Sequence, residues 1–232
     1  MNFNLLDFII LASGMLLGRL AIYLIEWLSI DEENEAELSD ADMQAFKKMT
    51  FVGLAVTLAL MMASAIAVLK WSEKPAADLF FSFFLLVVGG VDLKTKTIVV
   101  PSLLIGGGIS AVLAFASGMG IMDIALGGAV GFGVYYAIYA VAKLWYKREA
   151  FGYGDVLFMG AIGLFLGPWM TLLAGFLTFY VALVWIVIQK TIGRILSVKS
   201  EIAFAPYMAV AAWLTALFGN QIIELYLRLF MV

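Results

Sequence analysis

Residues 156–189 read VLFMGAIGLFLGPWMTLLAGFLTFYVALVWIVIQ, a stretch of 34 positions without a charged side chain. A helix needs about 20 residues to cross the hydrocarbon layer of a bilayer, so this stretch is too long for one crossing. Gly167 and Pro168 lie inside it, and a proline at such a place ends a helix. The stretch therefore predicts two membrane segments, a short one over 156–166 and a longer one over 169–189.

The rest of the chain is similarly apolar. Of its 232 residues, 64% are hydrophobic, whereas a soluble domain averages about 45–50%. Residues 4–30 predict a first span, retained because no basic region precedes it as in a cleaved signal peptide. Further uncharged stretches cover 50–69, 79–91, 97–122, 124–142 and 202–223. We therefore predict an all-α fold, a polytopic transmembrane helical bundle with about 7–8 membrane segments embedded in the lipid bilayer.

Composition also excludes several kinds of chemistry. The chain has no cysteine and no histidine, so disulfides, thiol nucleophiles, Cys/His zinc sites and Ser-His-Asp triads are ruled out. The net charge of -3 gives no basic surface for nucleic acid. We expect no cofactor and no metal, and chemistry that depends on Asp, Glu, Lys, Arg, Ser, Thr or Tyr.

The basic residues predict how the segments alternate across the membrane. Cytoplasmic loops carry an excess of Lys and Arg. If the loop after Asp92 is cytoplasmic, ten of the 14 basic residues lie inside, three lie outside, and Arg19 falls within the first span. The inside set is Lys47, Lys48, Lys94, Lys96, Lys143, Lys147, Arg148, Lys190, Arg194 and Lys199. This arrangement puts Asp92 and Asp155 on the same side of a cell inner membrane.

Glycines recur four positions apart in two of the predicted segments. Gly127 and Gly131 lie in one, and Gly163 and Gly167 lie in another. Small residues at this spacing let membrane helices approach closely. The pattern therefore predicts helix packing rather than catalysis.

Asp92 and Asp155 are the candidate catalytic residues, because each lies at the end of a long apolar run. An ionisable side chain near membrane depth is expensive and marks a functional site. Two carboxylates that meet there can share one proton, which is the acid/base arrangement of an aspartyl protease. Each residue taken alone has another explanation. Asp92 could simply be a charged residue at the point where a membrane span emerges, and Asp155 could be the N-cap of a helix. Gly152 and Gly154 permit a sharp turn before Asp155.

Three segments resemble the type IV prepilin peptidases and the related preflagellin peptidases, which are membrane aspartyl proteases of the G-x-G-D kind. Residues 90–98 (GVDLKTKTI) are similar to the segment around the first catalytic Asp of that family. Residues 152–156 (GYGDV) and 160–167 (GAIGLFLG) are similar to the second. Residues 202–207 (IAFAPY) are similar to a later Phe-Gly-Pro segment, with Ala205 in place of the usual glycine.

The resemblance implies an aspartic endopeptidase with Asp92 and Asp155 as its catalytic pair, acting at the cytoplasmic face on prepilin-like precursors. Lys94 and Lys96 are candidates for tuning the pair, or are solvated flanking charges. The chain then divides into a first span with a short acidic cytoplasmic loop (1–49) and a membrane-embedded peptidase domain (50–232). Because that loop is short and lacks cysteine, the resemblance favours peptidase activity over N-methylation of the product.

Two other functions fit the residues. A proton- or cation-coupled transporter could use Asp92 and Asp155, since membrane carboxylates commonly carry ions. A membrane subunit could instead dock a basic partner through the acidic block at 31–42. Neither the substrate nor the oligomeric state follows from the sequence.

Overall fold

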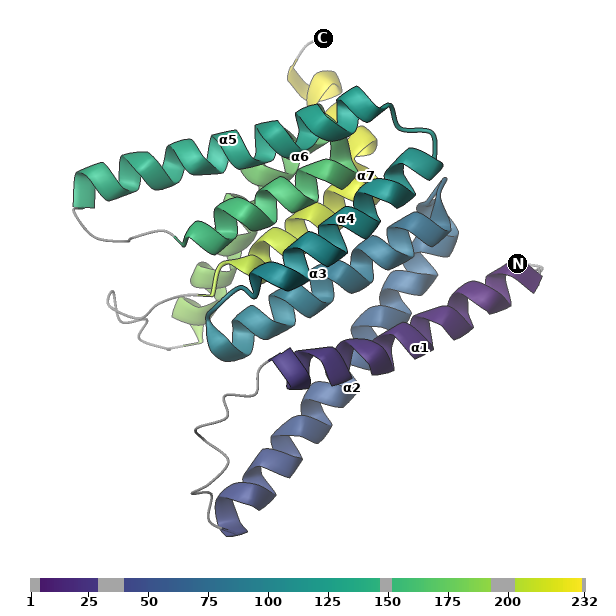
Figure 1. Cartoon of the computed structure of the whole chain (residues 1–232), viewed down its shortest axis with the longest axis vertical. Coiled ribbons are helices and arrows are strands. Elements are labelled where there is room, and N and C mark those ends of the chain that lie inside the picture. The colour runs from purple at the N-terminus through teal and green to yellow at the C-terminus, as the bar shows by residue number, and fades with distance from the viewer. Residues whose placement is uncertain (1–4, 29–39, 147–151, 193–202, 231–232) are drawn as a thin grey trace.

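The computed structural model describes residues 5–28, 40–146, 152–192 and 203–230, and every secondary-structure element in these ranges is a helix (Figure 1). By length and composition, five helices are able to cross a membrane, and two shorter apolar stretches accompany them. The prediction of an all-α polytopic bundle is confirmed. The helices are α1 (Leu5–Leu28), α2 (Asp40–Trp71), α3 (Pro75–Thr95), α4 (Val100–Ala116), α5 (Ile121–Tyr146), α6 (Tyr153–Thr191) and α7 (Ala205–Phe230).

Helix α6 consists of two segments that fold back on each other. Gly167 has φ 74° and ψ 173°, which is outside the helical region and strained for residues other than glycine, and Pro168 follows it. A Cβ atom on Gly175 would lie 4.0 Å from the Met159 side chain, although 16 positions separate the two residues. A straight helix would hold them about 24 Å apart. The predicted break at Gly167 and Pro168 is therefore confirmed.

Helix α5 packs against α6 through glycines. A Cβ atom on Gly127 would overlap the carbonyl oxygen of Gly163, and one on Gly131 would overlap that of Met159. The backbones thus touch with no side chain between them, as the four-residue spacing predicted. This contact holds the first segment of α6 firmly against α5.

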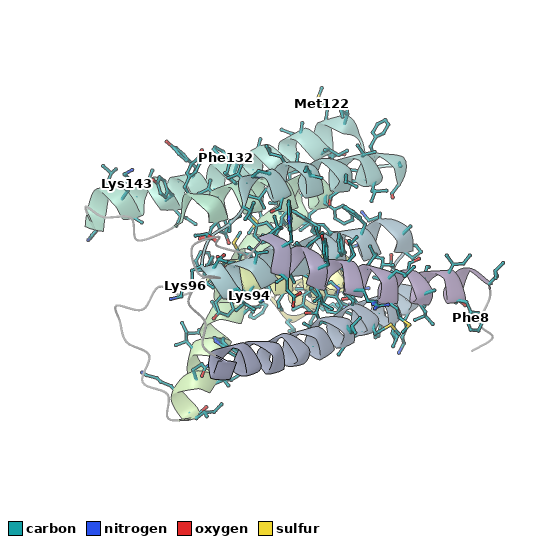
Figure 2. The ribbon with its side chains drawn as sticks, turned by 60° about the horizontal axis from the view of Figure 1, so that its bottom comes forward. Phe8, Lys94, Lys96, Met122, Phe132 and Lys143 are labelled. Atoms are coloured by element: carbon teal, nitrogen blue, oxygen red, sulfur yellow. The ribbon has the colours of Figure 1, made fainter. Side chains whose placement is uncertain are left out.

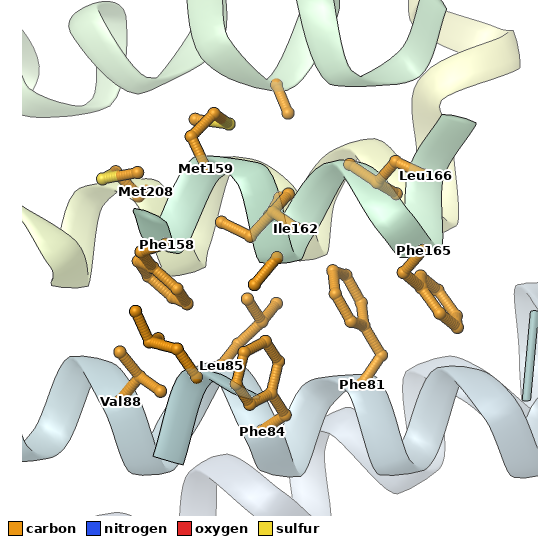
Figure 3. Close-up of a cluster of buried hydrophobic side chains, with 14 of the residues drawn as sticks. Phe81, Phe84, Leu85, Val88, Phe158, Met159, Ile162, Phe165, Leu166 and Met208 are labelled. Atoms are coloured by element: carbon orange, nitrogen blue, oxygen red, sulfur yellow. The ribbon is translucent and has the colours of Figure 1, made fainter. Parts of the chain in front are cut away.

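Helix α3 faces the same segment of α6 through large side chains (Figure 3). The Phe81 and Phe165 rings stack with centroids 4.1 Å apart, and Phe84 meets Phe158 edge to face at 5.8 Å. Three of these side chains are among the most completely buried in the described part of the chain. This aromatic layer sets the spacing between α3 and α6.

The lysines labelled in Figure 2 lie together at one end of the bundle. Lys94, Lys96 and Lys143 lie at one end of the bundle, and Phe8 and Met122 lie toward the other (Figure 2). Helix α2 runs without interruption across the predicted domain boundary at 49/50. That division remains a prediction, and most of the acidic block lies outside the described residues.

Candidate active site

Asp92 lies in the last turn of α3 and is 4% exposed. Its Oδ2 atom accepts a hydrogen bond of 3.0 Å from the backbone N–H of Ala205, the first residue of α7. The N–H groups of a first helical turn have no partner within their own helix. Asp92 therefore satisfies one of these donors on α7 from across the bundle, 113 positions away.

Two glycines before Asp92 make this contact possible. A Cβ atom on Gly89 would lie 3.4 Å from the Cα atom of Pro206, so α7 approaches α3 closely at this point. On another side of α3, a Cβ atom on Gly90 would lie 2.5 Å from the side chain of Ile25 in α1. The glycine pair thus lets α7 and α1 close on α3 about one turn before the carboxylate.

Asp155 lies in the first turn of α6 and is 9% exposed. Its carboxyl group forms a hydrogen bond with the backbone of Gly152, the N-cap residue. A Cβ atom on Gly152 would come within 2.9 Å of the Asp155 Oδ2 atom, and one on Gly154 would come within 3.0 Å of Ile98. Both glycines therefore leave space, Gly152 for the carboxylate and Gly154 for the loop that follows α3.

The packing of α3 on α6 brings Asp92 and Asp155 to the same end of the bundle. The two helices run antiparallel, and the stacked pair Phe81 and Phe165 gives their register. Asp92 follows Phe81 by 11 positions and Asp155 precedes Phe165 by 10, each about three turns in the same direction. The two carboxyl groups are close enough to interact electrostatically.

Lys94 and Lys96 lie beside Asp92 in sequence but have exposed side chains. Lys96 ends α3 in a left-handed conformation (φ 54°), and its N–H donates to the backbone oxygen of Asp92. A role for either lysine in tuning the acidic pair remains a prediction.

Sequence reasoning missed two groups at this site. The first is the Ala205 N–H, although Ala205 lies within the motif at residues 202–207. The second is Tyr135 of α5, which is 1% exposed, interacts electrostatically with Asp155, and donates a 3.3 Å hydrogen bond to the Gly175 carbonyl. A tyrosine within an apolar span gives no sequence signal that separates it from an ordinary core residue.

A third buried acid, Asp78, lies at the opposite end of α3. It is 3% exposed, and its Oδ2 atom accepts a hydrogen bond from Ser72 in the turn between α2 and α3. Burial of a carboxylate is thus not enough to define a site in this fold; the presence of a second acid distinguishes Asp92 and Asp155. Within the described ranges, no three acidic side chains gather as a metal site would require.

A helical membrane bundle that buries two interacting carboxylates at one end is the class of protein that this fold and site define. Residues 79–187 match the type IV leader peptidase family, and that segment contains both Asp92 and Asp155. Over this segment, which is just under half of its length, the chain is similar to the type IV leader peptidase family.

Several curated proteins are similar to the chain. The prepilin leader peptidase/N-methyltransferase of Stutzerimonas stutzeri is 29% identical over 172 residues, which cover 68% of this chain and 55% of that protein. The protein of the same name from Pseudomonas aeruginosa is 33% identical over 46% of this chain and 37% of its own length. The type 4 prepilin-like proteins leader peptide-processing enzyme of Escherichia coli O78:H11 is 29% identical over 63% of this chain and 53% of its own length. The chain spans about half the length of these relatives or less, and no solved structure matches it significantly.

Proposed function

We propose that this chain is a membrane aspartyl endopeptidase that removes the short leader from prepilin-like precursors, with Asp92 and Asp155 as its catalytic pair. The observation that carries the proposal is that two buried carboxylates lie at one end of the bundle and interact electrostatically, one at the end of α3 and the other in the first turn of α6. The names of the similar proteins supply the class of substrate.

The proposed reaction needs only the two acids and water. Close carboxylates cannot both ionise cheaply, so the pair holds one proton between them. The ionised member removes a proton from a water molecule, whose oxygen attacks the scissile carbonyl carbon. The protonated member then gives its proton to the leaving nitrogen as the C–N bond breaks. The products are a leader with a new carboxylate and a mature chain with a new amine.

The charge pattern supports a cytoplasmic position for this site. Lys94, Lys96 and Lys143 mark the end of the bundle at which α3 finishes and α6 begins (Figure 2). Since basic loops stay on the cytoplasmic side, the proposal places the cut at the cytoplasmic face of the inner membrane. The leader then remains in water while the apolar segment after it lies in the bilayer.

The test is cleavage of a prepilin-like precursor by the purified chain reconstituted in lipid. We expect Asp92→Ala and Asp155→Ala each to lower the cleavage rate by about 10²–10⁴-fold or more, the usual share of acid/base catalysis. Asp123→Ala is the matched control, because Asp123 is an exposed acid in the first turn of α5. Cleavage retained in either member of the pair rejects the mechanism.

The same vesicles separate this function from transport. A proton or cation flux that requires Asp92, without cleavage of any precursor, would identify a transporter. Methyl transfer to the new amine is not part of the proposal.

A further inference from the structure

A cavity of about 390 Å³ lies between α5 and the two segments of α6. This volume falls within the range of about 300–1,000 Å³ found for ligand pockets. The lining is mostly apolar and includes Val134, Tyr135, Leu172, Gly175, Phe176 and Phe179. Several of these side chains, Phe176 above all, are also exposed on the outer surface of the bundle. The cavity is therefore open toward the space that lipid occupies around a membrane protein.

Two residues in the wall of the cavity connect it to the acidic pair. Tyr135, in its wall, interacts electrostatically with Asp155. Phe179, which also lines the cavity, has its ring 5.9 Å from that of Phe204, the residue before the Ala205 N–H that binds Asp92. The rings of Tyr135 and Phe179 are 6.3 Å apart. An occupant of the cavity would thus contact one side chain that interacts with Asp155 and another that packs next to the segment binding Asp92.

Exposed tryptophans indicate how deep this region lies. Trp145, near the end of α5, is 81% exposed, and Trp169, just after the turn in α6, is 78% exposed. Tryptophan is enriched at both membrane interfaces. Tyr139 meets Tyr153, at the start of α6, with ring centroids 5.7 Å apart, and Trp145 lies six positions beyond Tyr139. Six helical residues rise about 9 Å, so the start of α6 lies about 9 Å deeper in the membrane than Trp145. The cavity extends deeper still.

We infer that this cavity binds apolar side chains of the substrate segment that follows the cleaved bond, and that its size determines which precursors are cleaved. The inference rests on the proposed function. An occupant must be apolar to match the walls, must enter from the bilayer, and must be continuous with a peptide bond at the acidic pair. The membrane-embedded part of a precursor meets all three conditions.

Gly175 provides a way to reduce the cavity. A Cβ atom on it would lie 3.3 Å from the Tyr135 ring and 4.0 Å from Met159, so a larger side chain projects into the cavity. Gly175→Leu is the test variant, and Gly175→Ala is a graded intermediate. Gly133→Leu is the control, because Gly133 on α5 is exposed and a Cβ atom there meets nothing within 4 Å.

Each enzyme is assayed in vesicles on two precursors whose first four residues after the cut are either bulky and apolar or all alanine. We expect Gly175→Leu to lower kcat/KM for the bulky precursor by about tenfold or more relative to the alanine precursor. Gly133→Leu keeps the wild-type ratio. Retained cleavage of the alanine precursor shows that the variant folds. An equal loss on both precursors, or an unchanged ratio, overturns the inference while wild-type cleavage sustains the proposed function. Wild-type failure on both precursors overturns both proposals.

A second measurement distinguishes substrate from lipid and does not depend on Gly175. Leu172, in the cavity wall, is replaced by a benzophenone amino acid and irradiated in vesicles with the bulky precursor present. A cross-link to the precursor, reduced by excess unlabelled precursor, supports the inference. Cross-links to lipid alone assign the cavity to an acyl chain and overturn it.

Discussion

The first segment of α6 has two interfaces built in opposite ways. Toward α5 it presents glycine, and the two backbones touch at Gly127 and Gly163. Toward α3 it presents Phe158 and Phe165, whose rings fill a wider space. In a bilayer, helix association depends on close packing because lipid is as apolar as the core. The glycine interface therefore fixes the position of α6 against α5, and the aromatic interface sets the distance between α3 and α6, the two helices that carry the acids.

The largest effect is expected at the glycine interface. A Cβ atom on Gly163 would overlap the backbone oxygen of Gly127, which cannot move without shifting the whole of α5. We expect Gly163→Ala to cost about 3 kcal/mol or more, at the upper end of overpacking effects. Thermal unfolding in detergent and the yield of monodisperse protein measure this cost. If Gly163→Ala unfolds like the wild type, the two helices are not in backbone contact.

The aromatic interface should respond more mildly. Phe158→Ala leaves a void between α3 and α6, and such a change costs about 3–5 kcal/mol in a soluble core. Part of that cost is the free energy of moving the side chain from water into the core, and this part is absent in lipid. A smaller loss of stability is therefore expected here. The cleavage rate should fall by more than the loss of stability explains, because the void alters the spacing of Asp92 and Asp155.

Phe115→Ala on α4 is the matched control, since Phe115 is exposed. The measurement is precursor cleavage beside thermal unfolding. Should Phe158→Ala retain full cleavage despite lower stability, the aromatic layer does not set the geometry of the pair.

The hydrogen bond from Ala205 of α7 to Asp92 lies at the end of α3 that carries the acid. Ala205→Pro removes the N–H that Asp92 accepts, while proline remains compatible with a first helical position. Loss of a hydrogen bond to a charged group is worth about 1.5–3 kcal/mol. We therefore expect kcat to fall roughly 10- to 100-fold with KM nearly unchanged. Ala205→Gly keeps the N–H and should remain near wild type; an equal loss in both variants would point to a structural role only.

A structural feature of this chain can be predicted from the sequence when neighbouring residues determine it. The break in α6 was predictable, because Gly167 and Pro168 act on their own backbone. The start of α3 at Pro75 follows from the same rule. The hydrogen bond between Ala205 and Asp92 spans 113 positions and depends on how α3 and α7 pack. No local pattern contains that information, and the same holds for the electrostatic interaction between Tyr135 and Asp155.

The glycines at 106–108 of α4 contact both α3 and α6. Substitutions there are expected to change stability the least. A Cβ atom on Gly106 would overlap the Phe84 ring, and one on Gly107 would lie 2.9 Å from the Ala161 Cβ atom. Gly108 faces open space. Since glycine in a helix is less favourable than alanine, Gly108→Ala should raise stability by about 0.5–1 kcal/mol. Gly107→Ala should lower stability, since α4 must move away from α6. Thermal unfolding of the two variants tests these opposite shifts in stability. Equal shifts would mean that α4 is not held against α6 at Gly107, and that only the glycines along α5 make a close backbone contact.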